Sequence, residues 1–208
     1  GIRDCLLSRG LGDVYKRQGI KVDQGLKPLD GSPEETLTQG LEGLSGRCSE
    51  YFQLGAKFTK WRAVIKIDGN LPSSECIESN MKALAEYAKI VQDNNMVPMV
   101  EPEVLMDGNH SIDRCYEVSS AALKSLFRAM SECGVNIKGT ILKPNMVTSG
   151  ASCDSQASIQ EVAEMTLRCL QENVPAELPG ITFLSGGQSD INSTAHLDAM
   201  NKIGGFPW

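Results

Sequence analysis

The 208-residue sequence contains very little histidine, with only His110 and His196. Catalytic triads that use histidine, and metal sites built from several histidines, therefore have almost no residues to draw on. The seven cysteines are widely scattered, odd in number and without a Cys-x-x-Cys pair. This pattern predicts neither a zinc site nor a disulfide framework, and it favours reduced thiols in a cytoplasmic compartment.

The sequence also lacks a long hydrophobic run and an excess of basic residues. A content of 41% hydrophobic and 22% charged residues is typical of a globular protein and predicts no membrane-spanning segment. The formal net charge of −6 provides no general basic field for nucleic acid. Neither a membrane nor a nucleic acid is an expected partner, but a local group of lysines can still bind a small phosphorylated anion.

Strand-like and helix-like segments alternate from Gly19 onward. Strands are expected at residues 19–23, 60–67, 97–101, 141–142 and 181–185, with helical periodicity between most of them. The polar residues on these strands recur at intervals of 39, 41, 42 and 42 residues, and they are Lys21, Lys60, Glu101, Lys143 and Ser185. This repeat predicts an α/β fold, namely an incomplete segment, about five β/α units, of a (β/α)8 TIM barrel. An open doubly wound sheet is the alternative, although it would concentrate its ligand site at one switch point.

Period-two alternation predicts which side chains face the barrel interior. Lys60 and Arg62 alternate with the apolar Trp61 and Ala63, and Lys21 and Asp23 alternate in the same way with Ile20 and Val22. We expect the charged residues to converge on one face. The alternative for any one of them is a solvated position at the rim.

Lys143 ends the apolar pair Ile141-Leu142 and precedes Pro144, which prevents an interior strand from continuing. Burial of an ammonium is costly, so a lysine at this position is a candidate for amine chemistry, with a solvated lysine as the alternative. Neighbouring cations disfavour protonation. One lysine in a group with Lys21 and Lys60 can therefore act as a nucleophile on a carbonyl and form a Schiff base.

Two further motifs fit such chemistry. Glu101 and Glu103 flank Pro102 and offer carboxylates for proton transfer, although Glu101 can also serve only as an ion-pair partner of a lysine. The turn Ser185-Gly186-Gly187 suits a phosphate, because glycines let backbone N–H groups approach an anion. The alternative for that turn is a merely flexible connection.

Five segments together resemble the class I fructose-bisphosphate aldolases, in the same order and spacing and over roughly Gly19 to the C-terminus: residues 19–23 (GIKVD), 60–62 (KWR), 97–103 (VPMVEPE), 142–147 (LKPNMV) and 183–189 (FLSGGQS). The resemblance implies that Lys143 forms a Schiff base with fructose 1,6-bisphosphate or dihydroxyacetone phosphate. It implies that Glu101 is the acid/base group and that Lys60 stabilises charge near Lys143. The remaining implied roles are substrate contact for Lys21 and Arg62, a hydrogen-bonded carboxylate in the lysine network for Glu103, and phosphate binding for Ser185, Gly186 and Gly187.

The implied reaction is the reversible cleavage of fructose 1,6-bisphosphate to dihydroxyacetone phosphate and glyceraldehyde 3-phosphate, in glycolysis and in the cytoplasm. The resemblance implies no metal and no other cofactor, because the protonated imine is itself the electron sink. It also suggests a homotetramer for the parent protein.

The sequence departs from the family pattern at both ends. The family's strand with an aspartate near the C4 hydroxyl should precede Gly19, and its final strand with a phosphate-binding arginine should follow Trp208. Residues 1–18 match no family segment, so we interpret them as a join of cloning or sequence assembly and residues 19–208 as a partial barrel domain. We expect the isolated chain to be inactive or nearly so. The alternatives are another imine-forming barrel aldolase, or a truncated product serving as a binding or oligomerisation module.

Overall fold

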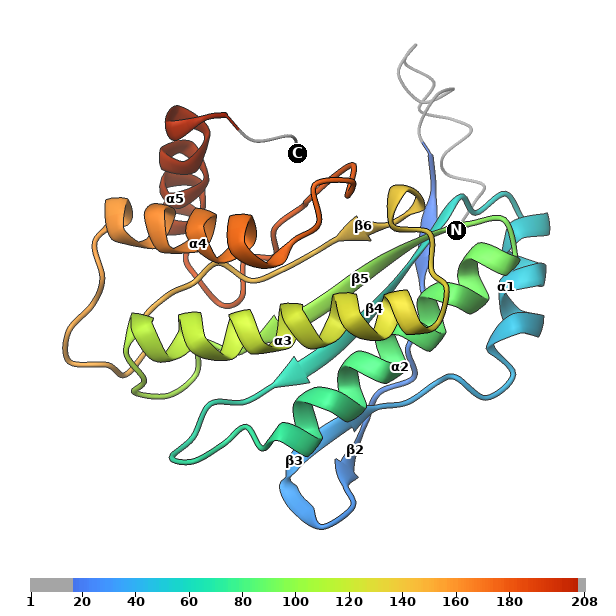
Figure 1. The fold of residues 1–208 in the computed structure, drawn as a ribbon, viewed down its shortest axis with the longest axis horizontal. Helices are drawn as coiled ribbons and strands as arrows, with labels where there is room; N and C mark the ends of the chain where they lie inside the picture. The colour runs from blue at the N-terminus through green and yellow to red at the C-terminus, as the bar shows by residue number, and fades with distance from the viewer. Residues whose placement is uncertain (1–16, 206–208) are drawn as a thin grey trace.

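The computed structural model describes residues 17–205, so most of the predicted N-terminal segment, residues 1–18, lies outside the described residues. Its centre is a parallel sheet of four strands in the order β1-β4-β5-β6 (Figure 1). The strands are β1 (Gly19–Lys21), β4 (Phe58–Ile65), β5 (Val97–Val104) and β6 (Ile141–Leu142). Strand positions near Gly19, Lys60, Val97 and Ile141 therefore agree with the sequence-based expectation.

Helices connect the parallel strands and follow the last of them. They are α1 (Leu44–Gln53), α2 (Ser74–Asp93), α3 (Ile112–Glu132), α4 (Ile159–Asn173) and α5 (Asp190–Ile203), with a short 3-10 helix, η3 (Ile137–Gly139), before β6. Four of the helices begin after a serine whose side chain accepts a hydrogen bond from a backbone N–H three residues later: Ser73, Ser111, Ser158 and Ser189. The predicted capping box of Ser158 and Glu161 is present.

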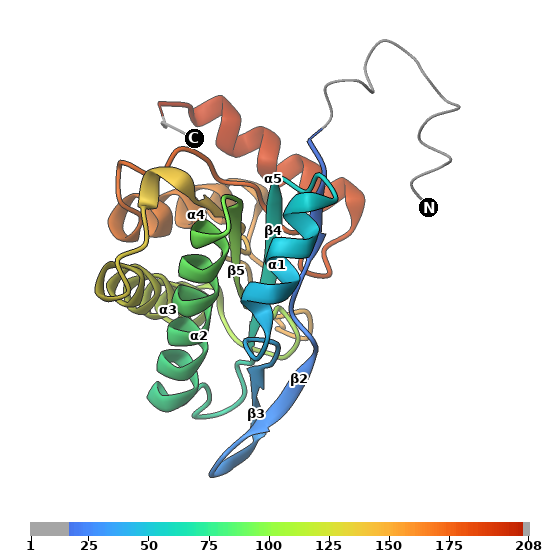
Figure 2. The same ribbon diagram turned by 90° about the vertical axis from the view of Figure 1, so that its right-hand side faces the viewer.

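The period-two alternation of β4 places its apolar and its charged side chains on opposite faces of the sheet, as predicted. Trp61, Ala63 and Ile65 are fully buried in the core, and Trp61 stacks on Tyr87 of α2 with ring centroids 5.3 Å apart. Helices α2 and α3 cover this face of the sheet (Figures 1 and 2). Lys60 and Arg62 point to the other face, which we call the polar face.

Two parts of the fold differ from the expectation. Residues 24–40, for which no strands were predicted, form an antiparallel hairpin of β2 (Leu26–Leu29) and β3 (Ser32–Thr38), which projects at one end of the sheet (Figure 2). The strand predicted at 181–185 is reduced to a single parallel bridge between Ile181 and Leu142. Because Pro144 ends β6 after two residues, the neighbouring segment has little ladder with which to pair.

The hairpin is anchored to the start of α2 by a buried carboxylate. Glu35 is 3% exposed and accepts hydrogen bonds from the backbone N–H and the hydroxyl of Ser73, at 2.7 and 2.6 Å. Thr38, at the end of β3, donates its hydroxyl to the carbonyl of Arg62 on β4. The hairpin thus holds both the first turn of α2 and the strand that carries Lys60 and Arg62.

Candidate active site

Glu101 is a buried carboxylate shared by two lysines. Its Oε2 lies 2.7 Å from Lys60 Nζ and its Oε1 lies 2.9 Å from Lys143 Nζ. The sheet order explains this arrangement, because β5 lies between β4 and β6 and a side chain on its polar face reaches both neighbours. The N–H of Lys143 donates to the carbonyl of Val100 at 2.8 Å, which sets Lys143 beside Glu101 in the register.

A second carboxylate, Asp23, follows β1 and joins the same cluster. Its Oδ1 lies 2.8 Å from Lys21 Nζ, and its Oδ2 lies 3.9 Å from Lys60 Nζ. The same Oδ2 accepts a hydrogen bond from the backbone N–H of Arg62 at 3.3 Å. Asp23 therefore links β1 to β4 through side chains at a point where β1 has already ended.

Arg62 and Glu103 form a further ion pair of the polar face. The hydrogen bond to Glu103 raises the pKa of the Arg62 guanidinium above its ordinary value, and burial opposes this only in part. Arg62 is thus a permanent cation at this site.

The carboxylates of this cluster are buried, and its cations lie closer to the solvent. The side chains of Asp23, Glu101 and Glu103 are only 5 to 6% exposed. The cations reach the solvent to a greater extent, with exposed fractions of 20% for Lys60, 27% for Lys143, 40% for Arg62 and 57% for Lys21. Four cations face three carboxylates, so the cluster carries one net positive charge and suits an anionic ligand.

This geometry is suited to amine chemistry. An amine must lose a proton before it attacks a carbonyl, and Glu101 lies at the right distance from Lys143 to accept that proton. Lys60, on the other side of Glu101, places a second cation where it can stabilise charge on a substrate oxygen. Among residues 17–205, no three histidine, cysteine, aspartate or glutamate side chains form a group that could hold a metal ion.

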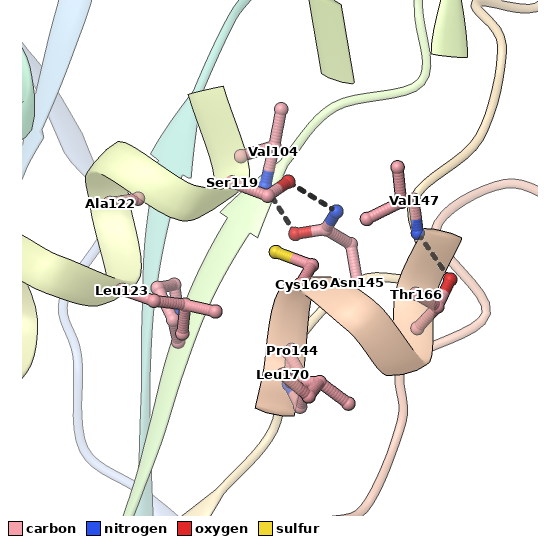
Figure 3. A pocket seen from close by; sticks show the side chains of 11 residues that line it. Val104, Ser119, Ala122, Leu123, Pro144, Asn145, Val147, Thr166, Cys169 and Leu170 are labelled. Carbon is pink, nitrogen blue, oxygen red and sulfur yellow. Dashed lines mark hydrogen bonds between the residues drawn. The ribbon is translucent and has the colours of Figure 1, made fainter. Parts of the chain in front are cut away.

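Asn145 supports the site from behind the sheet, and the sequence reasoning did not single it out. Its Oδ1 accepts the backbone N–H of Val104 at 3.0 Å, while its Nδ2 donates to Ser119 Oγ (Figure 3). The Nδ2 also donates to the carbonyl of Met146. Pro102 lacks an N–H group, so β5 cannot donate to β6 at the residue after Glu101, whereas the backbone of Pro144 faces the segment around Ile181 rather than β5. The Asn145 side chain replaces the missing backbone link.

Asn145 also lines a cavity of about 10 Å³, between the ends of β5 and β6 and helices α3 and α4 (Figure 3). A space of that size has room for about one water molecule. It lies behind the polar face and is too small for a sugar phosphate. We therefore interpret it as a packing feature rather than a ligand site.

The turn Ser185-Gly186-Gly187 is placed by the bridge next to β6. The N–H of Leu184 donates to the carbonyl of Pro144 at 3.2 Å, so the turn begins beside the residue after Lys143. Gly186 and Gly187 have φ values of 63° and 93°, which favour glycine. The described residues offer no hydrogen-bond partner to the N–H groups of these two glycines.

The structure thus brings seven of the ten predicted site residues into one set of ion pairs: Lys21, Asp23, Lys60, Arg62, Glu101, Glu103 and Lys143. The Ser185–Gly187 turn makes no direct contact with this set among the described hydrogen bonds and ion pairs, and it is connected through the backbone beside Lys143. The catalytic and binding roles of all ten residues remain proposals.

A comparison with protein families matches residues 8–208 to the model for class-I fructose-bisphosphate aldolase. The match begins inside the N-terminal segment, whose origin stays a prediction. No helix within residues 17–205 is both long enough and apolar enough to cross a membrane.

Individual proteins resemble the chain closely. It is 59% identical over 190 residues to a probable fructose-bisphosphate aldolase class 1 from Xanthomonas axonopodis pv. citri, covering 91% of this chain and 57% of that protein. It is 48% identical over 201 residues to the cytosolic fructose-bisphosphate aldolase 4 of Arabidopsis thaliana, covering 94% of this chain and 51% of that protein. The chain therefore spans little more than half the length of these relatives.

A solved structure has the same fold. The Plasmodium falciparum fructose-bisphosphate aldolase, crystallised with TRAP and a small-molecule inhibitor, superposes with a TM-score of 0.93 and 45% identity. The match covers 95% of this chain and 58% of that one. The predicted fold class, an α/β segment of a barrel, is confirmed.

Proposed function

The chain belongs to the class-I fructose-bisphosphate aldolase family, and on this premise we propose that it carries the imine-forming centre of such an aldolase. The proposed reaction is the reversible cleavage of fructose 1,6-bisphosphate to dihydroxyacetone phosphate and glyceraldehyde 3-phosphate. The contact of Glu101 with both Lys143 and Lys60 is the observation that supports this proposal most directly.

Lys143 is the proposed nucleophile. Its Nζ adds to the C2 ketone of the substrate, and Glu101 accepts the proton that the amine releases. The Lys143 ammonium loses two protons in all, and Glu101 passes both to the C2 oxygen, which leaves as water while a protonated imine forms between C2 and Nζ. Lys60, 2.7 Å from Glu101, stabilises negative charge on the oxygen during this exchange.

Cleavage follows from the imine. The C4 hydroxyl gives up its proton to a base, the C3–C4 bond breaks, and its electron pair moves to the imine nitrogen. Glyceraldehyde 3-phosphate leaves as the aldehyde, and the enamine is protonated at C3. Water then releases dihydroxyacetone phosphate from Lys143. The electron sink is the imine, so the proposed mechanism needs no other cofactor.

Lys21, Arg62 and the Ser185–Gly187 turn are the proposed substrate contacts. The excess of one positive charge in the cluster favours a substrate that carries phosphates. Ser185 Oγ and the N–H groups of Gly186 and Gly187, which bond to no described residue, are donors for one phosphate. Glu103 holds the Arg62 guanidinium in place.

We infer that the complete protein acts in the cytoplasm and as a homotetramer. Six cysteines of the described residues are free thiols, and the similar Arabidopsis protein is cytosolic. Sedimentation velocity on the full-length protein tests the assembly, and a monomer at micromolar concentration would contradict it.

Imine trapping tests the proposed function. The chain should be completed to the length of the Xanthomonas relative with that protein's remaining segments, incubated with dihydroxyacetone phosphate and reduced with borohydride. We expect cleavage of fructose 1,6-bisphosphate by this chimera and an adduct on the peptide that contains Lys143. An adduct on Lys60 would reverse the assignment of the two lysines, and the absence of cleavage and of any adduct would refute the function. Fructose 1-phosphate, assayed in parallel, measures substrate preference.

A further inference from the structure

His196 is one of only two buried residues of α5, the other being Met200. The histidine is 7% exposed, although most of its helix is open to solvent. Burial lowers the pKa of His196 below its ordinary value, so the ring is neutral near pH 7. A neutral, buried histidine needs a hydrogen-bond partner for the ring nitrogen that carries the proton.

Gln188 is that partner, and its orientation can be deduced. Gln188 Nε2 lies 3.0 Å from the carbonyl oxygen of Ser185, so the amide nitrogen donates to the turn. Its Oε1 therefore faces His196 Nδ1, at 2.6 Å. Because an amide oxygen only accepts, Nδ1 must carry the proton and donate it.

The resulting chain of hydrogen bonds ends on the proposed phosphate turn. The Ser185 carbonyl accepts both the side-chain and the backbone N–H of Gln188, at 3.0 and 3.1 Å. Gln188 Nε2 also lies 3.6 Å from Met146 Sδ, in the segment that follows Lys143. With the Ser185 carbonyl held in this way, the N–H groups of Gly186 and Gly187 have no hydrogen-bond partner among residues 17–205.

We propose that His196 and Gln188 form a support that holds the Ser185–Gly187 turn in its phosphate-binding conformation. His196 is then a positioning residue for phosphate recognition rather than a group that touches the substrate. This inference rests on the proposed function, since it assigns a task to the turn within the same site. It separates phosphate binding from imine chemistry, because His196 supports the turn and makes no contact with Lys143 or Glu101 among the described residues.

The test compares a phosphorylated ligand with an unphosphorylated one. In the completed chimera, borohydride trapping on Lys143 is measured against the concentration of dihydroxyacetone phosphate and, separately, of dihydroxyacetone. His196→Leu keeps much of the volume and removes the donor. We expect its half-saturating concentration to rise about three- to tenfold for dihydroxyacetone phosphate, the loss of about one hydrogen bond, and to stay unchanged for dihydroxyacetone.

Two further variants make the result specific. His196→Asn places an amide donor near the position of Nδ1 and should restore most of the phosphate preference. His110→Leu is the matched control, because His110 is equally buried, at 7% exposed, and makes no hydrogen bond to the turn. If His196→Leu does not fold, Gln188→Met removes the same link from the side of the turn and serves in its place.

The outcomes separate the two proposals. Equal loss for both ligands, no loss for either, or failure of His196→Asn to restore the preference would overturn the support role. Absence of any Lys143 adduct in the unsubstituted chimera would instead refute the proposed function. A selective loss that Asn restores and that His110→Leu does not reproduce would establish the support.

Discussion

Lys143 Nζ lies 2.9 Å from Glu101 Oε1, across the boundary between two neighbouring parallel strands. The amine is 27% exposed, whereas the carboxylate is 5% exposed. This pairing leaves the amine accessible to a substrate and places a proton acceptor beneath it. The relationship explains how an apolar strand can end on a lysine without an unpaired buried charge.

Replacement of the proposed nucleophile should abolish imine formation. Lys143→Met keeps the length of the side chain and removes the amine, so we expect no borohydride adduct in the completed chimera. Cleavage of fructose 1,6-bisphosphate should fall by about 10³-fold or more, because covalent catalysis is lost. Lys89→Met is the control and should keep full activity, because Lys89 lies on α2 and its ion pair among the described residues is with Asp93. Residual turnover within tenfold of the parent would mean that another group carries the reaction.

Removal of the proton acceptor should slow imine formation without abolishing it. Glu101→Gln keeps the shape of the side chain but leaves Lys60 and Lys143 without their shared counter-charge. We expect a fall of about 10²- to 10⁴-fold in the single-turnover rate of imine formation, the usual contribution of a general acid or base. Rapid quench with borohydride measures that rate. An unchanged rate would show that Glu101 serves only as an ion-pair partner.

Asn145 should couple the stability of the sheet to the activity of the site. Asn145→Leu leaves the buried N–H of Val104 without its acceptor, and we expect a loss of about 1 to 3 kcal/mol in the free energy of unfolding. Because the side chain joins the two strands that carry Glu101 and Lys143, kcat should fall more than KM rises. Thr166→Val is a comparison, since the Thr166 hydroxyl accepts a hydrogen bond from the N–H of Val147 farther along the same segment. It should reduce stability and change kcat less.

The comparison of Asn145 with Lys60 shows what the sequence could and could not predict. The alternation around Lys60 and Trp61 is local, so one strand's residues suffice to assign its two faces. The role of Asn145 depends on Pro102, which is far from it in sequence and leaves β5 without one donor toward β6. A proline inside a central strand is a usable signal that another group must link that strand to its neighbour.

Other differences have similar causes. The hairpin of β2 and β3 has a local signal in Asp30-Gly31, a pair typical of tight turns that the strand prediction does not use. The segment 181–185 is largely apolar, as a strand requires, but it forms a single bridge because Pro144 has no N–H group with which to extend the pairing. The contact between Gln188 and His196 joins a turn to the middle of α5, and residue type alone does not predict it.

Glu35 should make stability depend on pH in the acid range. Burial alone would raise the pKa of Glu35, but its hydrogen bonds from Ser73, together with weaker ones, outweigh burial and lower it below 4.5. A carboxylate with a lowered pKa in the folded state adds stability that is present above pH 4.5 and is lost as the pH falls through the folded-state value. Urea midpoints measured from pH 3 to pH 7 should therefore decline more steeply below pH 4.5 for the unsubstituted protein than for Glu35→Gln. Parallel curves would contradict this assignment.

Gly186 should be required for phosphate recognition because of its backbone conformation, and the lack of space around it is a second reason. Its φ of 63° lies in the left-handed region, and an added Cβ would come within 2.9 Å of a methyl carbon of Leu184. Gly186→Ala therefore costs roughly 1 to 2 kcal/mol in that conformation and drives the turn toward another one. We expect KM for fructose 1,6-bisphosphate to rise about fivefold or more, while trapping with unphosphorylated dihydroxyacetone stays unchanged.

Gly180→Ala is the matched control, since its φ is not in this region and an added Cβ would meet no atom within 4 Å. If both alanine variants raised KM equally, the turn's conformation would not be the cause. A selective effect at Gly186 would link the backbone of the turn, and the side chains that support it, to the phosphate of the substrate.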